Sequence, residues 1–240
     1  MGNEEHQNDM IQKLKNAVFF EGMGDDFFEM AASHFQEVRM KKSDDIDSAE
    51  TLKYFYIIDE GSVKIIHVDP ESGRSIAPFL LSSHEAFDIL PIIDGKENMA
   101  DYIAVEKSVL LKTEAHFIRE WVNEYPQITI NLLQCLSKKL RELENFSESI
   151  VFYDTKTRLS NLILKYAFKE KKRLKESKII QVAQKFSHET LAEMIGSVRS
   201  VVTTQLQELK RDGVILDKHA EIMIKDLEQL KDRCAKYIDL

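Results

Sequence analysis

The residues of this 240-residue chain that could carry a specific chemistry are concentrated in one stretch, FSHETLAEMIGSVRSVVTTQLQELKRDGVI, residues 186–215. The apolar spacing predicts a short helix, a turn at Gly196 and a second helix. One arginine and several hydroxyl residues are expected on the outward side of the second helix: Arg199, Ser200, Thr203 and Thr204. Arginine can bind guanine O6 and N7 together, and Ser and Thr can contact bases or phosphates. The pattern indicates a helix-turn-helix that binds double-stranded DNA.

The residues around this motif are predicted to hold it in place. Ser197 is expected to cap the second helix, because a serine oxygen can accept from an unpaired backbone N–H, and it is also a candidate for contact with DNA. Lys210 and Arg211, at the far end, are further phosphate candidates. Asp212-Gly213 is a turn, and residues 214–216 and 221–224 predict a β-hairpin, the wing of a winged helix-turn-helix. Five apolar residues are expected to pack the second helix on the first: Val198, Val201, Val202, Leu206 and Leu209.

The charge is divided unevenly along the chain. The net charge is −8, but residues 1–154 hold 15 basic against 29 acidic residues, and residues 155–240 hold 18 against 12. An acidic first part joined to a basic second part suggests two domains with different partners. Chance segregation of surface charge is the alternative.

Other features exclude several classes of protein. The two cysteines, Cys135 and Cys234, match no metal or redox spacing, which favours a reducing cytoplasm. The polar, acidic N-terminus is not a secretory signal, and no apolar run approaches the ~20 residues of a membrane span, so no membrane association is expected. No Ser-His-Asp, zinc or phosphate-loop pattern occurs, and we expect no catalytic site.

The first part of the chain changes its periodicity twice. Residues 9–38 have helical spacing. Short β-rich runs follow at 54–58, 62–68, 75–81 and 101–112, separated by turns such as Asp59-Glu60-Gly61. Short strands with intervening turns predict a small antiparallel sandwich or roll.

From residue 128 the spacing is helical again, and apolar residues follow a three-four alternation: Leu133, Leu136, Leu140, Leu143 and Ile150. Such a narrow stripe indicates a coiled-coil seam between two copies of the chain. An ordinary amphipathic core helix is the alternative. Asp154-Thr155 interrupts the pattern, and a new helix is predicted over 158–172.

Taken together, these pieces resemble the Crp/Fnr superfamily of bacterial transcription regulators over nearly the whole chain. The matching stretches are YFYIIDEGSVKIIHVD, LSKKLRELENF and LAEMIGSVRSVVTTQLQELKRDGVI. The resemblance implies an α+β fold with a cyclic-nucleotide-binding-like β-roll sensor at 1–125, a dimerisation helix at 126–152 and a winged helix-turn-helix at 153–240. It also implies a homodimer on a pseudo-palindromic operator, with RNA polymerase as a further partner.

The resemblance assigns roles to individual residues. Arg199 occupies the base-contacting arginine position, and Ser187 and His188 occupy positions that usually contact phosphate. Ser200 lies where many members carry glutamate, and Thr204 where some carry a second arginine. We therefore expect an operator different from that of the cAMP-responsive members.

The sensor region lacks the family's known effector motifs. Cyclic-nucleotide members use a glutamate and an arginine, whereas this chain has Ile89 at the first position and Asn98, beside Glu97, near the second. We therefore expect no cAMP binding. Two cysteines are too few for an iron–sulfur cluster.

Other effectors stay open. One alternative is a haem-based regulator of the same family that senses nitric oxide or redox state. A single histidine can ligate haem, and His67 and His84 are the candidates, ahead of His34 and His116. Cys135 could be a thiol sensor, or only a buried apolar residue. A ligand-binding or protein-interaction module that does not bind DNA is the alternative from another class.

Overall fold

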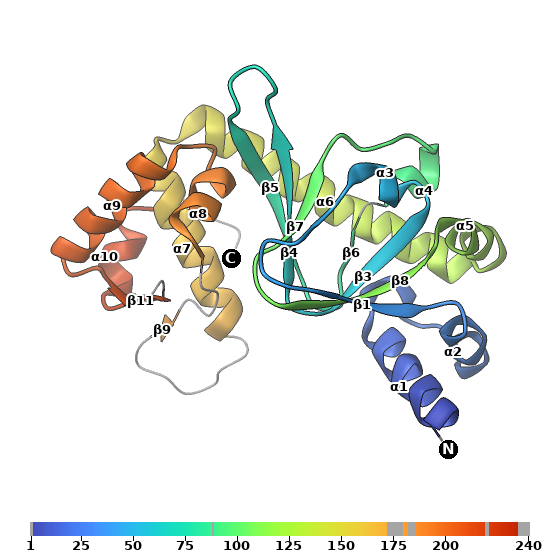
Figure 1. The fold of residues 1–240 in the computed structure, drawn as a ribbon. Helices are drawn as coiled ribbons and strands as arrows, with labels where there is room; N and C mark the ends of the chain where they lie inside the picture. Colours follow the sequence, from blue (N-terminus) through green and yellow to red (C-terminus); the bar gives the residue numbers. More distant parts are fainter. Residues whose placement is uncertain (1, 88, 172–179, 182–185, 219–220, 235–240) are drawn as a thin grey trace. The chain divides into compact units, whose positions relative to one another are not determined.

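The structure is a computed structural model that describes residues 2–87, 89–171, 180–181, 186–218 and 221–234 (Figure 1). The chain divides into two compact units. The first unit comprises Met1–Val68 and Phe79–Glu142, and the second comprises Asp69–Pro78 and Leu143–Leu240. No helix in the described part of the chain is long and apolar enough to cross a membrane.

The first unit contains two antiparallel four-stranded sheets, apart from the first residues of β5, which fall in the second; the strand orders are β1-β8-β3-β6 and β2-β7-β4-β5. This arrangement is the roll that the sequence predicts. The strands are β1 (Gln36–Met40), β2 (Asp45–Ile46), β3 (Tyr54–Glu60), β4 (Ser62–Val68), β5 (Ser75–Ser82), β6 (Ala86–Phe87), β7 (Asp101–Ala104) and β8 (Ser108–Glu114).

Strand β3 is buried on both faces, which explains its uninterrupted apolar run. Tyr56 and Ile58 belong to the apolar cluster that lies between the sheets. Phe55 and Ile57, the alternate residues, belong to the second cluster, which the helices of the unit cover. Gly61 ends the strand with φ +92°, and a β-carbon there would lie 2.8 Å from the Lys107 carbonyl oxygen, so this turn requires glycine.

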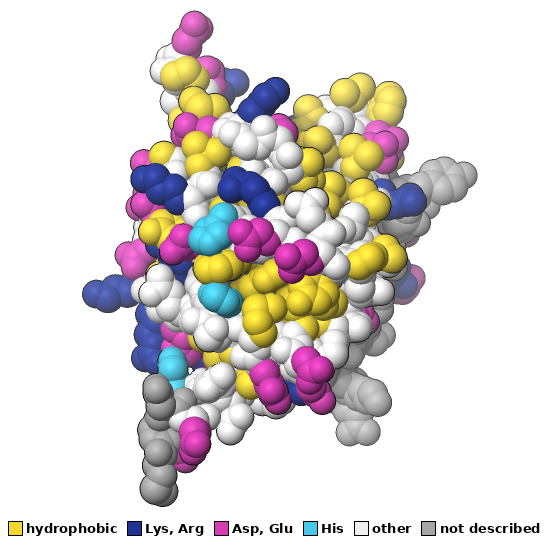
Figure 2. Space-filling view, turned by 90° about the vertical axis from the view of Figure 1, so that its right-hand side faces the viewer, with side chains coloured by type: hydrophobic (Ala, Val, Ile, Leu, Met, Phe, Trp, Pro, Cys, Tyr) yellow, Lys and Arg dark blue, Asp and Glu magenta, His cyan; other side chains and the backbone are white. Residues whose placement is uncertain are grey.

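Most helices of the first unit pack on the outer face of the sheet that contains β3: α1 (Gly2–Asn16), the 3-10 helix η1 (Val18–Phe20), α2 (Asp25–Ala32), α4 (Leu90–Asp94), α5 (Ala115–Glu124) and the first part of α6 (Pro126–Phe152). A further short helix, α3 (Ser48–Thr51), precedes β3, and its Glu50 carboxylate lies 3.4 Å from the Lys112 ammonium of β8. Aromatic side chains from η1, α2 and α5 contact one another: Phe20 and Phe27 each lie edge-to-face on Trp121, with ring centroids 6.0 Å and 5.3 Å apart. Acidic side chains are spread over the face drawn in Figure 2, with hydrophobic ones gathered between them.

A cluster of charges attaches α1 to the roll. The Lys13 ammonium contacts the carboxylates of Asp9 (2.6 Å), Glu37 and Asp59 (3.7 Å). Burial opposes the charged form of Lys13, but the hydrogen bonds to Asp9 and Glu37 outweigh it and raise the pKa. The hydrogen bond from Lys13 lowers the pKa of Glu37, whereas burial raises that of Asp59.

The second unit is a winged helix-turn-helix. It contains the end of α6, α7 (Thr155–Lys171), α8 (His188–Met194), α9 (Arg199–Arg211) and α10 (Leu227–Lys231). A three-stranded sheet of order β10-β11-β9 completes it, with β9 (Ile180–Gln181), β10 (Ile215–Lys218) and β11 (Glu221–Ile224). The wing hairpin predicted from the sequence is therefore β10–β11. Lys172, the last residue of the helix predicted over 158–172, lies outside the described residues.

Two predicted elements differ from the structure. The helical prediction over 9–38 is wrong at its end, because Gln36–Met40 forms β1 and pairs antiparallel with β8. The single strand predicted over 101–112 is two strands, β7 and β8, which belong to different sheets. Both differences depend on long-range strand pairing, which local periodicity does not report.

Candidate nucleic-acid interface

Helix α8 begins with a side-chain cap. Ser187 is the N-cap residue, and its Oγ accepts a hydrogen bond from the Thr190 backbone N–H at 3.0 Å. The apolar side chains of α8 are buried: Leu191, Ala192 and Met194. Ser187 itself is exposed, so its hydroxyl lies at the surface at the start of α8.

The turn into α9 needs Gly196, whose φ is +59°. The prediction that Ser197 caps α9 is wrong, because the N-cap is Val198 and no side chain caps the helix. The Ser197 N–H donates to the Ala192 carbonyl at 2.8 Å and closes the turn instead. The turn occupies one residue more than expected, so α9 begins at Arg199.

The residues that pack α9 against the rest of the unit lie in the middle of the helix and toward its C-terminus. Val202, Leu206 and Leu209 are buried, as predicted. Val198 and Val201 are not part of this packing face, in contrast to the prediction, since they are 43% and 37% exposed.

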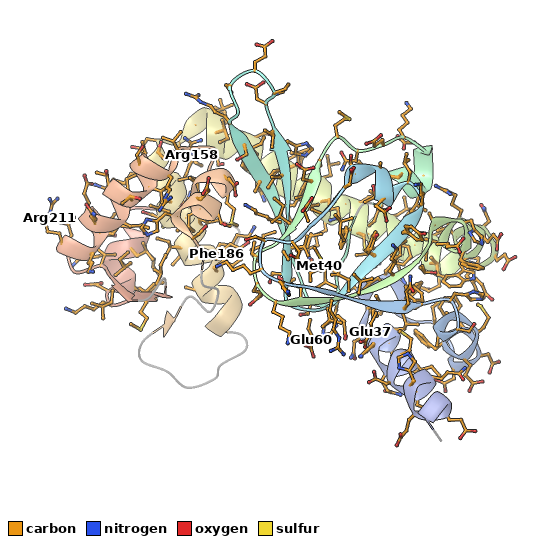
Figure 3. The ribbon with its side chains drawn as sticks, viewed as in Figure 1. Glu37, Met40, Glu60, Arg158, Phe186 and Arg211 are labelled. Atoms are coloured by element: carbon orange, nitrogen blue, oxygen red, sulfur yellow. The ribbon has the colours of Figure 1, made fainter. Side chains whose placement is uncertain are left out.

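The outward side of α9 contains most of the predicted DNA-contacting residues. Arg199, Ser200 and Thr204 are exposed in its first two turns. The first turn contains no acidic residue, and the positive end of the helix dipole therefore suits a phosphate. Arg211, in the last turn, points away from the rest of the unit in Figure 3, and 76% of its side chain is exposed.

Thr203 has a different environment from its predicted neighbours. It is half-buried, and its hydroxyl donates to the Arg199 carbonyl at 2.9 Å. The same oxygen lies 2.9 Å from the Nδ1 atom of His188. A hydroxyl has one hydrogen, so while Thr203 donates to the Arg199 carbonyl, the second bond requires the His188 tautomer that carries its proton on Nδ1. This pair joins the start of α8 to the start of α9, a link that sequence reasoning missed.

Side chains of α7 and of the end of α6 contact α9 and the turn that precedes it. The Lys156 ammonium lies 3.0 Å from the Glu208 carboxylate and joins α7 to α9. Arg158, labelled in Figure 3, donates from Nη2 to Thr155 at 3.3 Å, and its Nη1 lies near the Gly196 turn. The Ile150 side chain, at the end of α6, contacts the same turn.

The residues predicted to form a dimer seam differ in exposure. Leu133, Leu140, Leu143 and Ile150 are 56%, 59%, 43% and 39% exposed. Leu136 is half-buried and packs on the core of the first unit. Four of the five are therefore surface residues of α6, which covers the range 126–152 in which the sequence predicts the long helix.

The interior of the roll is occupied by an aromatic stack. Tyr56 and Phe87, from one sheet, have ring centroids 5.1 Å apart and an interplanar angle of 3°. Tyr102, from the other sheet, lies 5.1 Å from Phe87. Ile89, at the family's glutamate position, is 2% exposed and belongs to the core. Asn98 donates to the Tyr102 hydroxyl at 3.1 Å.

The candidate haem ligands occupy different local settings. His67 Nδ1 lies 3.0 Å from the Met99 carbonyl oxygen. His84 has φ +73°, and its backbone N–H donates to the Ile58 carbonyl. His34 and His116 both lie against the Phe117 ring. Haem binding stays a prediction. Within the described ranges, no three His, Cys, Asp or Glu side chains come together as a metal site.

Burial makes both thiols weak nucleophiles at neutral pH. It raises the pKa of Cys135, despite the nearby Lys139 and Lys138, and raises the pKa of Cys234 to about 11. A thiol with a raised pKa stays protonated, and protonated thiols react slowly. The environment of Cys135 therefore favours the apolar role over the thiol sensor.

Comparison with known proteins agrees with this geometry. Residues 157–233 match the family model of the Crp-like helix-turn-helix domain. The CRP-like cAMP-activated global transcriptional regulator of Mycobacterium tuberculosis is 23% identical over 225 residues, which are 93% of this chain and 99% of that protein. The global nitrogen regulator of Synechococcus elongatus is 30% identical over 164 residues, 67% of this chain and 72% of that protein.

A solved structure extends the comparison to the fold. FixK2 from Bradyrhizobium japonicum has a TM-score of 0.71 at 16% identity, with 85% of this chain and 99% of that chain covered. Two antiparallel sheets, a long helix and a winged helix-turn-helix thus occur here together with clear sequence similarity. The chain therefore belongs to the Crp/Fnr family of transcription regulators.

Proposed function

We propose that this protein is a homodimeric, sequence-specific regulator that binds a pseudo-palindromic operator through α9. The observation that carries the proposal is the exposed group Arg199, Ser200 and Thr204 at the acid-free start of α9. In this arrangement Arg199 contacts a guanine, and Ser200 and Thr204 contact neighbouring bases. Ser187 and His188, at the start of α8, contact the phosphate backbone.

The exposed stripe on α6 supports pairing with a second copy. Leu133, Leu140 and Leu143 are large apolar residues on one helix, and they are exposed to solvent in the single chain. A parallel partner helix would bury them and would hold the two α9 helices in successive major grooves, about 34 Å apart. The basic excess of residues 155–240 suits the phosphate backbone.

The signal that switches the protein is not cAMP in this proposal. Ile89 cannot accept a hydrogen bond from a ribose hydroxyl, and Asn98 carries no charge for a phosphate. The stack of Tyr56, Phe87 and Tyr102 fills the roll with the chain's own side chains. A different signal would change the population of the DNA-binding arrangement. We further propose a cytoplasmic location and RNA polymerase as a partner, as in regulators of this kind.

The test is selection of binding sites from random duplex DNA, followed by affinity measurements on the selected site. We expect two inverted half-sites about one helical turn apart and a steep loss of affinity with salt. Arg199→Ala should lower affinity for the selected site about 5- to 150-fold, from the ~1–3 kcal/mol of a bidentate base contact, and should change binding to random duplex much less.

Arg39→Ala is the matched control, because Arg39 is also an exposed arginine but belongs to the first unit, with 76% of its side chain exposed. It should leave affinity unchanged. Two outcomes would contradict base recognition by Arg199. One is that no sequence is enriched from the random library, and the other is that Arg199→Ala lowers affinity for random and for selected DNA by the same factor.

A further inference from the structure

Two valine side chains, those of Val198 and Val201, are exposed at the start of α9. Val198 is the N-cap residue and is 43% exposed, and Val201, in the first turn, is 37% exposed. The Val201 N–H donates to the Val198 carbonyl at 3.1 Å, so the two residues belong to the same turn. Residues three apart on a helix lie on the same side.

Val198 and Val201 are not among the buried residues that pack α9 on the rest of the unit. The contact between α9 and the rest of the unit is made by Val202, Leu206 and Leu209, which are at most 2% exposed. Single exposed valines are common on protein surfaces. These two, however, flank Arg199, the residue proposed to contact a base, in the turn that enters the major groove.

The major groove offers one apolar group on the base edges, the C5-methyl group of thymine. Valine suits such a contact, because its branched side chain has few rotamers and loses little conformational entropy on contact. We propose that Val198 and Val201 form an apolar contact for a thymine methyl group, and that they specify an A·T pair near the base pair contacted by Arg199. This inference rests on the proposed function and adds the chemical identity of a second base.

The test uses deoxyuridine, which pairs like thymine but lacks the C5-methyl group. Each thymine of the selected half-site is replaced in turn by deoxyuridine, and the affinity of the full-length protein is measured. A buried methyl group is worth about 0.8 kcal/mol, so one position should show a roughly fourfold loss. In the Val198→Ala/Val201→Ala variant, the same replacement should change affinity by much less.

Measuring the deoxyuridine effect with both the original protein and the double variant distinguishes a direct methyl contact from an effect of the methyl group on DNA shape. Deoxyuridine alters stacking equally for both proteins, so only a methyl–valine contact makes the loss depend on the valines. Val68→Ala is the matched control, since Val68 is a 48% exposed valine of β4, and it should keep the full fourfold effect. Thermal unfolding of the double variant checks that the second unit remains folded.

Three outcomes would overturn the inference, and they are distinguishable. Deoxyuridine could have no effect at any position, or it could have the same effect with and without the valines. In either case specific binding and its dependence on Arg199 would stand, and only the methyl contact would fall. If no duplex is bound specifically, the proposed function falls, and this inference falls with it.

Discussion

The Cδ1 atom of Ile150 lies 2.5 Å from the position that a β-carbon on Gly196 would occupy. Ile150 is in the last turn of α6, and Gly196 is in the turn between α8 and α9. The side chain at the end of the proposed dimer helix therefore fills the space that the missing side chain of Gly196 leaves. This contact connects the end of α6 to the turn that sets the start of α9.

Gly196→Ala should therefore destabilise the second unit more than Gly213→Ala. Both glycines have positive φ, +59° and +75°, so alanine at either costs roughly 1–2 kcal/mol of backbone strain. Only at position 196 must Ile150 also move, because nothing lies within 4 Å of a β-carbon at Gly213. Denaturant unfolding of both variants, repeated in an Ile150→Ala background, measures the difference. Equal costs in the original background would contradict the contact.

Leu140→Lys should separate the dimer while leaving the protomer folded. Leu140 is 59% exposed, so lysine there disturbs no packing within the chain, but two lysines would meet in a paired α6 seam. Analytical ultracentrifugation should show monomers, and operator affinity should fall. Val18→Lys, at a 48% exposed residue of η1, should remain dimeric. A dimer that persists in Leu140→Lys would rule out this seam.

Thr203→Val should destabilise the helix-turn-helix by about 1 kcal/mol. Valine has the shape of threonine but cannot accept from His188 Nδ1, so the link between α8 and α9 is lost. Thr204→Val is the matched control, because the Thr204 hydroxyl bonds within its own helix, to the Ser200 carbonyl at 3.1 Å, and is exposed. Chemical denaturation compares the two, and equal stabilities would show that the link contributes nothing.

Lys13→Met should destabilise the first unit at neutral pH by about 1–3 kcal/mol, since it removes the cation that Asp59 and Glu37 share and leaves Glu37 only the more exposed Arg39, at 3.5 Å. The folded-state pKa of Glu37 is lowered, so the stabilisation from its ion pair is present above its unfolded pKa and is lost as pH falls through the folded one. The cost of the substitution should therefore shrink in acid.

Unfolding by urea at pH 7 and near pH 3 measures this change. Lys41→Met, at an exposed lysine just after β1, is the control and should have little effect at either pH. A cost that is the same at both pH values would mean that Lys13 acts through packing of its aliphatic stem, not through charge.

Cyclic AMP should not change the affinity of the protein for its operator. Ile89 is buried in the core, and the Asn98 amide is bonded to Tyr102, so neither replaces the charged contacts of cyclic-nucleotide members. Isothermal calorimetry with cAMP should give only the heat of dilution. Saturable binding with heat would show that the roll accepts the nucleotide through other residues.

The order of elements followed from local patterns in the sequence. The apolar residues of α8 and the middle of α9, the glycine between them and the turn before the wing are all close in sequence. Periodicity and turn chemistry therefore predict them without knowledge of the fold. The same holds for β3 and β4, whose apolar runs are separated by the Gly61 turn. The similarity to the Crp/Fnr family arises from these same stretches.

Only the tertiary structure determined which side chains are exposed at the surface and which contact distant parts of the chain. Gln36–Met40 is a strand because β8 pairs with it, although the segment just before it is the helix α2. Val198 and Val201 are outside because Val202, Leu206 and Leu209 already fill the contact of α9. Thr203 and Ile150 have partners, His188 and the Gly196 turn, that are many residues distant. Such contacts depend on how elements meet in space, and the helical period of a single segment contains no information about its partner.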